Sequence, residues 1–277
     1  MGGMPRIAIC APSTPIARED AARLREIGET YGGIELAFHE QCFVEQGHFA
    51  GSDDVRLAAF LECANDPGFD AVWFAKGGYG ANRIAAAAVG RLGEHAASKT
   101  FLGYSDTGYL LAALYRAGVG KPVYGPMPVD IRREDGEEAV RRALNWFSGD
   151  DSGLEPSLGQ TPTVAFNLYT LAMTVGTDLM PDLSGHVVMV EEIAEHLYAV
   201  DRLFFHVTQQ LEDVAGIRLG RIGAIPENDR PFGTSEEDIV CYWCQRTGIP
   251  YLGRADIGHD VANKIVPFGV AGSAARS

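Results

Sequence analysis

The sequence predicts an α/β protein with two domains, the first built on a parallel sheet and the second smaller and of mixed α/β structure. Two observations carry this prediction. In the first half, short and continuous apolar runs alternate with longer segments of helical periodicity, as expected for strands that are buried on both faces. A polar segment rich in turn-forming residues, 148–163, then separates this half from the remainder.

Residues 1–147 are predicted to form the first domain. Each apolar run ends in a turn, and a segment with apolar residues at helical spacing follows it. The predicted strands are 6–13, 34–38, 70–75, 100–104 and 122–125, and the predicted helices are 17–32, 52–66, 80–90, 107–118 and 136–149. This alternation is typical of flavodoxin-like and Rossmann-like parallel sheets.

Residues 148–163 are predicted to be a linker, and residues 164–277 to form the second domain. The segment from 251 onward indicates irregular loop combined with strands. The predicted strands here are 186–190 and 216–223, and the predicted helices are 194–211 and 235–248.

Composition excludes several classes of partner. Acidic residues outnumber basic residues 37 to 23 in a chain of 277, which gives a net charge of -14. Nucleic acid and anionic lipid both require a basic face, so we expect no binding to either. No apolar run has the length of a membrane span, and the first residues lack the pattern of a signal peptide. Five cysteines without a disulfide-like framework favour the reducing cytoplasm.

Three short patterns suggest cofactor or metal sites, and each fails. A dinucleotide fingerprint starting at Gly78 would need glycine or alanine where Arg83 stands. The "AGVGKP" stretch lacks the first glycine of a phosphate loop and has Pro122 in place of its hydroxyl residue. The "CYWC" stretch has no second cysteine pair for zinc. We therefore expect no cofactor and no metal.

Polar residues after the strands are candidates for a site, because ligands bind beyond the carboxyl ends of parallel strands. Ser105 follows strand 100–104 where a helix begins, the position of a nucleophile on a strand-turn-helix elbow. Spacing alone favours the simpler interpretation that Ser105 or Asp106 caps that helix. Gly77 and Gly78 follow strand 70–75 and allow close approach of a ligand, although a tight turn explains them equally.

Two further candidates lie in the second half. Glu191 follows strand 186–190 and is placed to orient a histidine, with Glu195 as the nearby alternative. A helix N-terminus, which favours acidic residues, explains both glutamates as well. His259 lies in a glycine-flanked loop, where a backbone hydrogen bond is the simpler explanation.

Together and in this order, these pieces resemble the LD-carboxypeptidase family of serine peptidases, which includes murein tetrapeptide carboxypeptidases and microcin immunity peptidases. The resemblance runs nearly end to end. The matching stretches are "APS" (11–13), "KGGYGANR" (76–83), "GYSD" (103–106), "GP" (125–126), "AFNL" (165–168), "VEEIAEHLYAVDR" (190–202) and "GHDVANKIVPFG" (258–269). Three positions depart from the family pattern, with Lys76 replacing arginine and Phe166 and Asp260 each replacing glycine.

The resemblance implies a catalytic triad of Ser105, Glu191 and His259. It also implies an oxyanion site at the amides of Asp106 and of the turn formed by Gly77 and Gly78. Candidates for substrate binding are Lys76, Arg83 and Tyr104, the first two for a terminal carboxylate.

The implied reaction cuts the amide between the L-centre of a diamino acid and a terminal D-alanine in a murein tetrapeptide, which salvages cell-wall fragments in the cytoplasm. A homodimer is also implied. Two alternatives stay open: a peptidase of the microcin immunity type acting on a peptide–nucleotide conjugate, with Trp243 or Phe232 stacking on the base, and a ligand-binding relative without catalysis.

Overall fold

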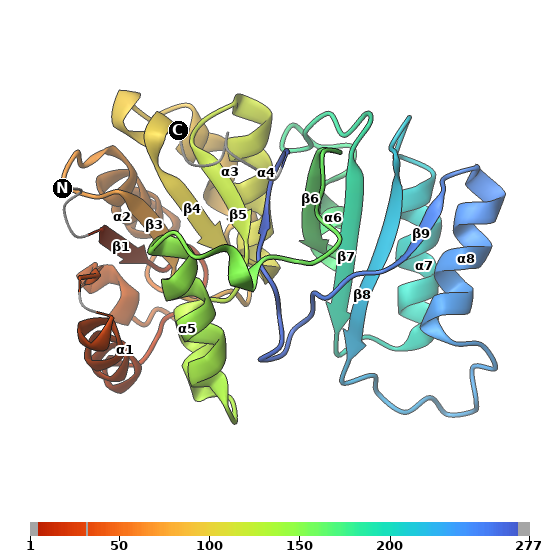
Figure 1. Cartoon of the computed structure of the whole chain (residues 1–277), viewed down its shortest axis with the longest axis horizontal. Coiled ribbons are helices and arrows are strands. Elements are labelled where there is room, and N and C mark those ends of the chain that lie inside the picture. The colour runs from red at the N-terminus through yellow and green to blue at the C-terminus, as the bar shows by residue number, and fades with distance from the viewer. Residues whose placement is uncertain (1–4, 32, 271–277) are drawn as a thin grey trace.

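The computed structural model describes residues 5–31 and 33–270, which form two sheets that lie side by side (Figure 1). The first sheet has six strands in the order β10-β5-β4-β3-β1-β2, all parallel except β10. The second sheet has four parallel strands in the order β6-β7-β8-β9. The predicted α/β class with a parallel N-terminal sheet and a second, smaller α/β unit is confirmed.

The strands are β1 (Arg6–Cys10), β2 (Glu35–Phe38), β3 (Ala71–Phe74), β4 (Thr100–Gly103), β5 (Lys121–Tyr124), β6 (Thr163–Asn167), β7 (Val187–Ile193), β8 (Gly216–Gly223), β9 (Tyr251–Arg254) and β10 (Val266–Pro267). The α-helices are α1 (Arg18–Thr30), α2 (Asp53–Asn65), α3 (Asn82–Val89), α4 (Gly108–Ala117), α5 (Gly136–Phe147), α6 (Leu168–Thr174), α7 (Leu197–Thr208) and α8 (Glu236–Thr247). Short 3₁₀ turns are η1 (Glu40–Phe43), η2 (Glu94–Ser98), η3 (Ser105–Thr107), η4 (Pro128–Arg132) and η5 (Asp151–Gly153).

Local sequence signals account for several helix ends. The Ser52 side chain accepts a hydrogen bond from the Val55 amide, the N-cap expected at that position. At α8, Ser235 and Asp238 form a reciprocal capping box. Gly118 ends α4 in the left-handed conformation that glycine adopts without strain. These caps fix where each helix starts or stops relative to the sheets.

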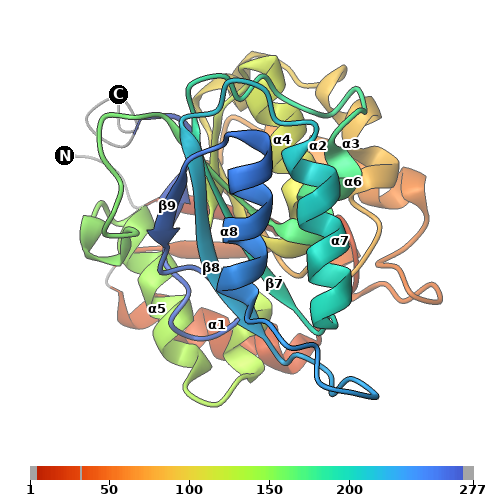
Figure 2. The same cartoon turned by 90° about the vertical axis from the view of Figure 1, so that its right-hand side faces the viewer.

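Helices cover both faces of the first sheet, with α1 and α5 on one side and α2, α3 and α4 on the other (Figure 1). The second sheet packs against α6, α7 and α8, and α7 and α8 lie side by side (Figure 2). Burial of strands on both faces explains why their sequences are continuous apolar runs rather than alternating ones.

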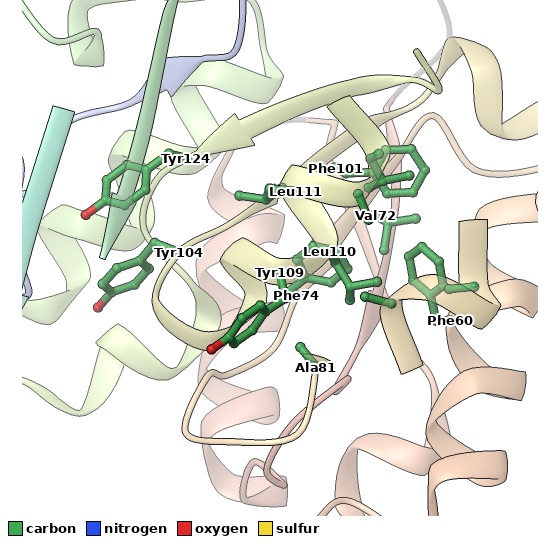
Figure 3. Close-up of a cluster of buried hydrophobic side chains, with 14 of the residues drawn as sticks. Phe60, Val72, Phe74, Ala81, Phe101, Tyr104, Tyr109, Leu110, Leu111 and Tyr124 are labelled. Atoms are coloured by element: carbon green, nitrogen blue, oxygen red, sulfur yellow. The ribbon is translucent and has the colours of Figure 1, made fainter. Parts of the chain in front are cut away.

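One buried cluster of the first sheet reaches toward the second. Figure 3 shows Phe60 and Phe101 at one end of this cluster and the rings of Tyr104 and Tyr124 at the other. The tyrosine hydroxyls point away from the phenylalanines. The polar end of this cluster therefore lies toward the junction of the sheets, where Ala165, Val187 and Met189 of the second sheet complete it.

The last strand connects the two sheets. β10 pairs antiparallel with β5, so residues 266–267 belong to the first sheet although they fall within the predicted second domain. Just beyond, Gly269 exchanges two backbone hydrogen bonds with Thr163 of β6, at 2.8 and 2.9 Å. The segment 148–163 is also packed, since Glu155 is buried and accepts a hydrogen bond from the Asp256 amide.

None of the helices in the described part of the chain has both the length and the apolar character that a bilayer crossing requires.

Candidate active site

Ser105 lies where β4 ends and the chain turns into α4. Its φ angle is +60°, a left-handed conformation that is uncommon for a residue with a side chain. Strain of this kind persists where the surrounding structure holds it, and it is frequent at functional sites. Neither η3 nor α4 has a side-chain N-cap, so the interpretation of Ser105 or Asp106 as a helix cap is wrong.

Asp106 fixes this elbow to two neighbouring loops. Its Oδ2 accepts a 2.5 Å hydrogen bond from the Ser13 hydroxyl, in the loop after β1, and a 2.9 Å bond from the Ala81 amide, after β3. The Thr14 hydroxyl donates to the Gly77 carbonyl at 2.6 Å. The carboxyl ends of β1, β3 and β4 thus form one interlinked edge of the sheet.

The glycine turn after β3 approaches Ser105 closely. A Cβ on Gly77 would lie 3.1 Å from the Ser105 Oγ and 3.4 Å from the Asp106 amide nitrogen. Gly78 has a φ angle of +104°, and a Cβ there would lie 2.6 Å from the Thr14 side chain. A side chain at Gly77 would therefore crowd Ser105, and Gly78 is required both by its close contact with Thr14 and by its backbone conformation.

His259 and Glu191 form a buried pair. The imidazole Nδ1 lies 2.5 Å from Glu191 Oε2, and Glu191 is fully buried. Burial opposes protonation of the imidazole, but the charge and hydrogen bond of Glu191 outweigh it, so the pKa of His259 is raised from its ordinary value. The Tyr104 ring packs against the imidazole with centroids 4.8 Å apart. The carboxylate therefore orients this histidine and favours its protonated form.

The loop that carries His259 crosses the second sheet after β9 (Figure 1). Gly220 of β8 permits this approach, because a Cβ there would lie 2.7 Å from the Ile257 carbonyl oxygen. Asn263 accepts a 3.0 Å hydrogen bond from the Gly258 amide. Asp260 accepts two hydrogen bonds from Arg221, at 2.5 and 2.9 Å, so the aspartate that replaces a family glycine holds this loop against β8.

Ser105 and His259 line two cavities that meet between them and also share Gly78. The smaller cavity has a volume of about 300 Å³ and includes Lys76. The larger has a volume of about 720 Å³ and opens over α6 and the end of β7. Within the described residues, no group of three or more His, Cys, Asp or Glu side chains is arranged to hold a metal.

Comparison with known proteins identifies the family of this chain. Residues 7–125 match the model of the LD-carboxypeptidase N-terminal domain, and residues 160–273 match that of the LD-carboxypeptidase C-terminal domain. The chain belongs to the LD-carboxypeptidase family. Membership indicates a carboxypeptidase, which is a hydrolase.

Similar family members come from several bacteria. A probable murein peptide carboxypeptidase of Bacillus subtilis is 28% identical over 86% of this chain and 78% of its own length. A murein tetrapeptide carboxypeptidase of Pseudomonas aeruginosa is 25% identical over 95% of this chain and 91% of its own. The crystal structure of a muramoyltetrapeptide carboxypeptidase from Oxalobacter formigenes has a TM-score of 0.81, with 25% identity over 95% of this chain and 92% of that one.

The microcin C7 self-immunity protein MccF shares the fold. Its structure in complex with aspartyl sulfamoyl adenosine has a TM-score of 0.76 and 18% identity, covering 98% of this chain and 92% of that one.

The predicted substrate-binding residues have different surroundings. Lys76 lines the smaller cavity, and burial together with nearby Arg132 lowers the pKa of its amine. Arg83 lines neither cavity that contains Ser105, because its guanidinium pairs with Asp53 of α2 at 2.9 Å. Tyr104 lines the smaller cavity, and its hydroxyl donates to Asp130.

Glu191 and Glu195 were the two candidates to orient His259, and they occupy different positions. β7 continues to Ile193 and α7 begins only at Leu197, so Glu191 lies within the sheet and not at a helix N-terminus. Glu191 contacts His259, whereas Glu195 lines the larger cavity. The explanation of Glu191 by a helix N-terminus is therefore wrong.

Sequence reasoning assigned no role to several lining residues. Glu192 is buried and accepts three hydrogen bonds, from the Asn167 side chain and the amides of Tyr169 and Ile193, at 2.7–2.8 Å. Burial raises the pKa of this carboxyl group to about 7. Asp130 joins the smaller cavity from the loop after β5. The sequence signal that could have identified Asp130 was its position in a loop that follows a parallel strand.

The aromatic residues of the larger cavity were missed as well. Trp243 and Phe232, the predicted stacking residues of the nucleotide alternative, are not among the described residues that line it. Trp243 instead packs in the core of the second sheet and donates to Asp201. The aromatic rings that do line it are those of Tyr79, Tyr109 and Tyr169.

Proposed function

We propose that this protein is a serine-type LD-carboxypeptidase that removes the terminal D-alanine from a murein tetrapeptide, cutting its amide bond to an L-diamino acid. The observation that best supports this is the position of Ser105, strained at φ +60°, in the same cavities as a histidine that a buried glutamate orients. The names of the similar proteins from Bacillus subtilis and Pseudomonas aeruginosa supply the substrate class.

The proposed mechanism assigns one role to each of these three residues. His259 removes the proton from the Ser105 hydroxyl as the oxygen attacks the carbonyl carbon, and later gives that proton to the departing amine. Glu191 holds the imidazole in the productive tautomer and stabilises the imidazolium that forms. Water then hydrolyses the acyl-enzyme with His259 again acting as base.

The oxyanion binds at the amides of Asp106 and of the Gly77–Gly78 turn in this proposal. Support comes from the close approach of Gly77 to both the Ser105 Oγ and the Asp106 nitrogen. Each donor of this kind contributes about 3–4 kcal/mol to transition-state stabilisation.

The smaller cavity takes the departing residue. Its volume of about 300 Å³ suits a residue as small as alanine, and Lys76 supplies a cation for the terminal carboxylate. Two other cations of this cavity are already paired, Arg132 with Asp20 and Arg133 with Asp130. Lys76, rather than Arg83, is therefore the proposed carboxylate-binding residue.

Salvage of wall fragments in the cytoplasm and a homodimeric state belong to the same proposal, and family resemblance supports both. All five cysteines lie in the described residues as free thiols, which is compatible with a reducing compartment.

A second candidate is cleavage of a peptide–nucleotide conjugate. The larger cavity favours it through Tyr79 and Tyr169, whose side chains are partly exposed at its rim and available to stack on a base.

The test is a comparison of wild type and Ser105→Ala on four substrates: a murein tetrapeptide, the same peptide with terminal L-alanine, an all-L analogue and an aspartyl sulfamoyl adenosine. Products are followed by mass spectrometry. We expect D-alanine release by wild type alone, with both L-alanine peptides spared. Cleavage of the adenosine conjugate only would replace the first candidate by the second, and cleavage of none would leave a binding protein.

Lys76→Ala and Arg83→Ala separate the two predicted carboxylate ligands. Loss of an ion pair to a substrate carboxylate costs about 1.5–3 kcal/mol, so Lys76→Ala is expected to raise KM for the tetrapeptide by about tenfold or more. Arg83→Ala is expected to leave KM within about threefold, because its partner is Asp53. The reverse order of effects would assign the carboxylate to Arg83.

A further inference from the structure

Three buried polar atoms next to the pair of Glu191 and His259 lack hydrogen-bond partners. They are Oε1 of Glu191, the hydroxyl oxygen of Tyr124 and Nδ2 of Asn263, and none is paired with any of residues 5–31 and 33–270. The exposed fractions of Glu191, Tyr124 and Asn263 are 0%, 1% and 1%. Buried polar atoms are nearly always hydrogen-bonded, because folding removes the water that solvated them. These three atoms therefore require partners.

The three side chains come from different elements that meet at the junction of the two sheets. Glu191 lies in β7, Tyr124 is the last residue of β5, and Asn263 lies in the loop that carries His259. The Tyr124 hydroxyl points away from the phenylalanine rings of its cluster (Figure 3). Burial raises the pKa of this hydroxyl well above its ordinary value, the charge of Glu191 adds to the effect, and the nearby Asn263 amide opposes it. Glu191 and Asn263 are thus both neighbours of the hydroxyl.

The hydrogen-bonding capacities of the three groups match a single water molecule. The phenol of Tyr124 and the amide nitrogen of Asn263 are donors, and the carboxylate oxygen of Glu191 is an acceptor. A water among them accepts from both donors and donates to the carboxylate, which makes about three bonds, the usual number for a buried water. The other carboxylate oxygen of Glu191, Oε2, is already engaged by His259.

We infer that Tyr124 is a positioning residue that holds the second oxygen of Glu191, joined to it by one buried water that Asn263 also binds. This rests on the proposed function, in which Glu191 orients the base His259. A carboxylate held at both oxygens keeps its plane, so Oε2 stays aligned with the imidazole.

The same link tempers the charge that His259 experiences. The positive end of the hydroxyl dipole, relayed by the water, offsets part of the negative charge of Glu191. Tyr124 therefore keeps more of the imidazole in the neutral form that acts as base.

Other groups around these residues stay the same when only the Tyr124 hydroxyl is removed. The charged and titratable groups that face His259 or Tyr124 are Glu191 and Glu192 of β7, Arg221 of β8, Asp130 of η4 and Tyr104 after β4. Tyr124 and Asn263 are not among the described residues that line the two cavities at Ser105. An effect of Tyr124 on the reaction therefore passes through Glu191 and not through contact with substrate.

The test removes the hydroxyl with Tyr124→Phe, which keeps the ring and its edge contact with Tyr104. Tyr251→Phe is the matched control, because the Tyr251 hydroxyl in β9 donates a 2.8 Å hydrogen bond to the carboxylate of Glu237, away from both cavities. D-alanine release from a murein tetrapeptide is measured across a range of pH for wild type and both variants. Tyr124→Phe is also made in the Glu191→Gln background, and thermal unfolding verifies that each protein is folded.

At neutral pH we expect Tyr124→Phe to lower kcat by about tenfold, the range of a hydrogen bond to a charged group, and to leave KM within about threefold. The rising limb of kcat/KM should move to higher pH, and Tyr251→Phe should match wild type. In the Glu191→Gln background, Tyr124→Phe should change kcat by less than about threefold, because two residues that act through one link are not additive. An equal loss in both backgrounds, an unchanged kcat or an unmoved limb would overturn the inference.

Failure of the proposed function is a separate result. If wild type cleaves no peptide, the pKa of His259 is measured by NMR in wild type, Tyr124→Phe and Tyr251→Phe, each labelled at histidine. A higher pKa of His259 in Tyr124→Phe alone would uphold the inference, and an equal or lower pKa would overturn it.

Discussion

Replacement of Glu191 by glutamine removes the charge that faces His259 and keeps the side-chain size. The carboxylate is fully buried and lies 2.5 Å from the imidazole Nδ1, so the charge that develops on the imidazole in the transition state loses its counter-ion. Unit charges about 4 Å apart at an effective dielectric constant of about 20 interact by about 4 kcal/mol. At about 1.4 kcal/mol for each factor of ten, kcat should fall by about 10³-fold.

The glutamine amide can also donate to Nδ1, which would move the imidazole proton to Nε2 and deepen the loss. The assay is D-alanine release from a murein tetrapeptide. Glu212→Gln, which makes the same change of charge at an exposed glutamate before β8, is the matched control. Thermal unfolding verifies that each variant is folded. Glu191→Gln retaining more than about a tenth of wild-type kcat would refute the assignment, as would an equal loss in Glu195→Gln.

Three further predictions concern the same region. Gly77→Ala places a methyl group 3.1 Å from the Ser105 Oγ. We therefore expect kcat to fall by about tenfold or more, with little change of melting temperature. A fully active variant would show that this turn does not contact the reacting atoms. Since the pKa of His259 is raised and its neutral form is the base, kcat/KM should increase with pH through a pKa above the ordinary histidine value, and in Glu191→Gln this limb should move to lower pH. Burial raises the pKa of Glu192 to about 7, so its carboxyl keeps its proton in the folded state where the unfolded state has lost it. Its contribution to stability should therefore decline by about 3 kcal/mol between pH 4.5 and pH 7. The pH dependence of the unfolding free energy in urea should show this decline in wild type and lose it in Glu192→Gln, and identical slopes in the two proteins would contradict the assignment.

Much of the fold was predictable because parallel strands and their helices are local patterns. Continuous apolar runs and turn residues located β1 to β5 and their helices to within a few residues. β10 was not predictable, because a strand of two residues, Val266 and Pro267, has no periodicity of its own and exists only through its pairing with β5. The surroundings of Glu192 were not predictable for a related reason, since its partners come from β6 and α6 as well as its own strand.

The candidate site was predicted mainly through ordered motifs, not through spacing. Spacing alone favoured a helix cap at Ser105, and only the structure reveals the strained elbow. The role of Arg83 shows that matching a family motif does not by itself predict which groups a residue contacts. It stands in the expected position of the glycine-rich stretch, yet the packing of α2 beside α3 gives it Asp53 as a partner. The position of an ion pair between two helices depends on their packing, which the sequence pattern does not contain.

The pairing of β10 has a consequence for the order in which the enzyme is built. The proposed nucleophile, Ser105, follows β4, while its proposed base, His259, lies between β9 and β10, the last two strands in chain order. A ribosome therefore completes the serine elbow long before it completes the histidine loop, and that loop is anchored at both ends only when β10 docks on β5. In the proposed mechanism, a growing chain thus carries Ser105 without its base, and the two residues come together only in the step that closes the first sheet.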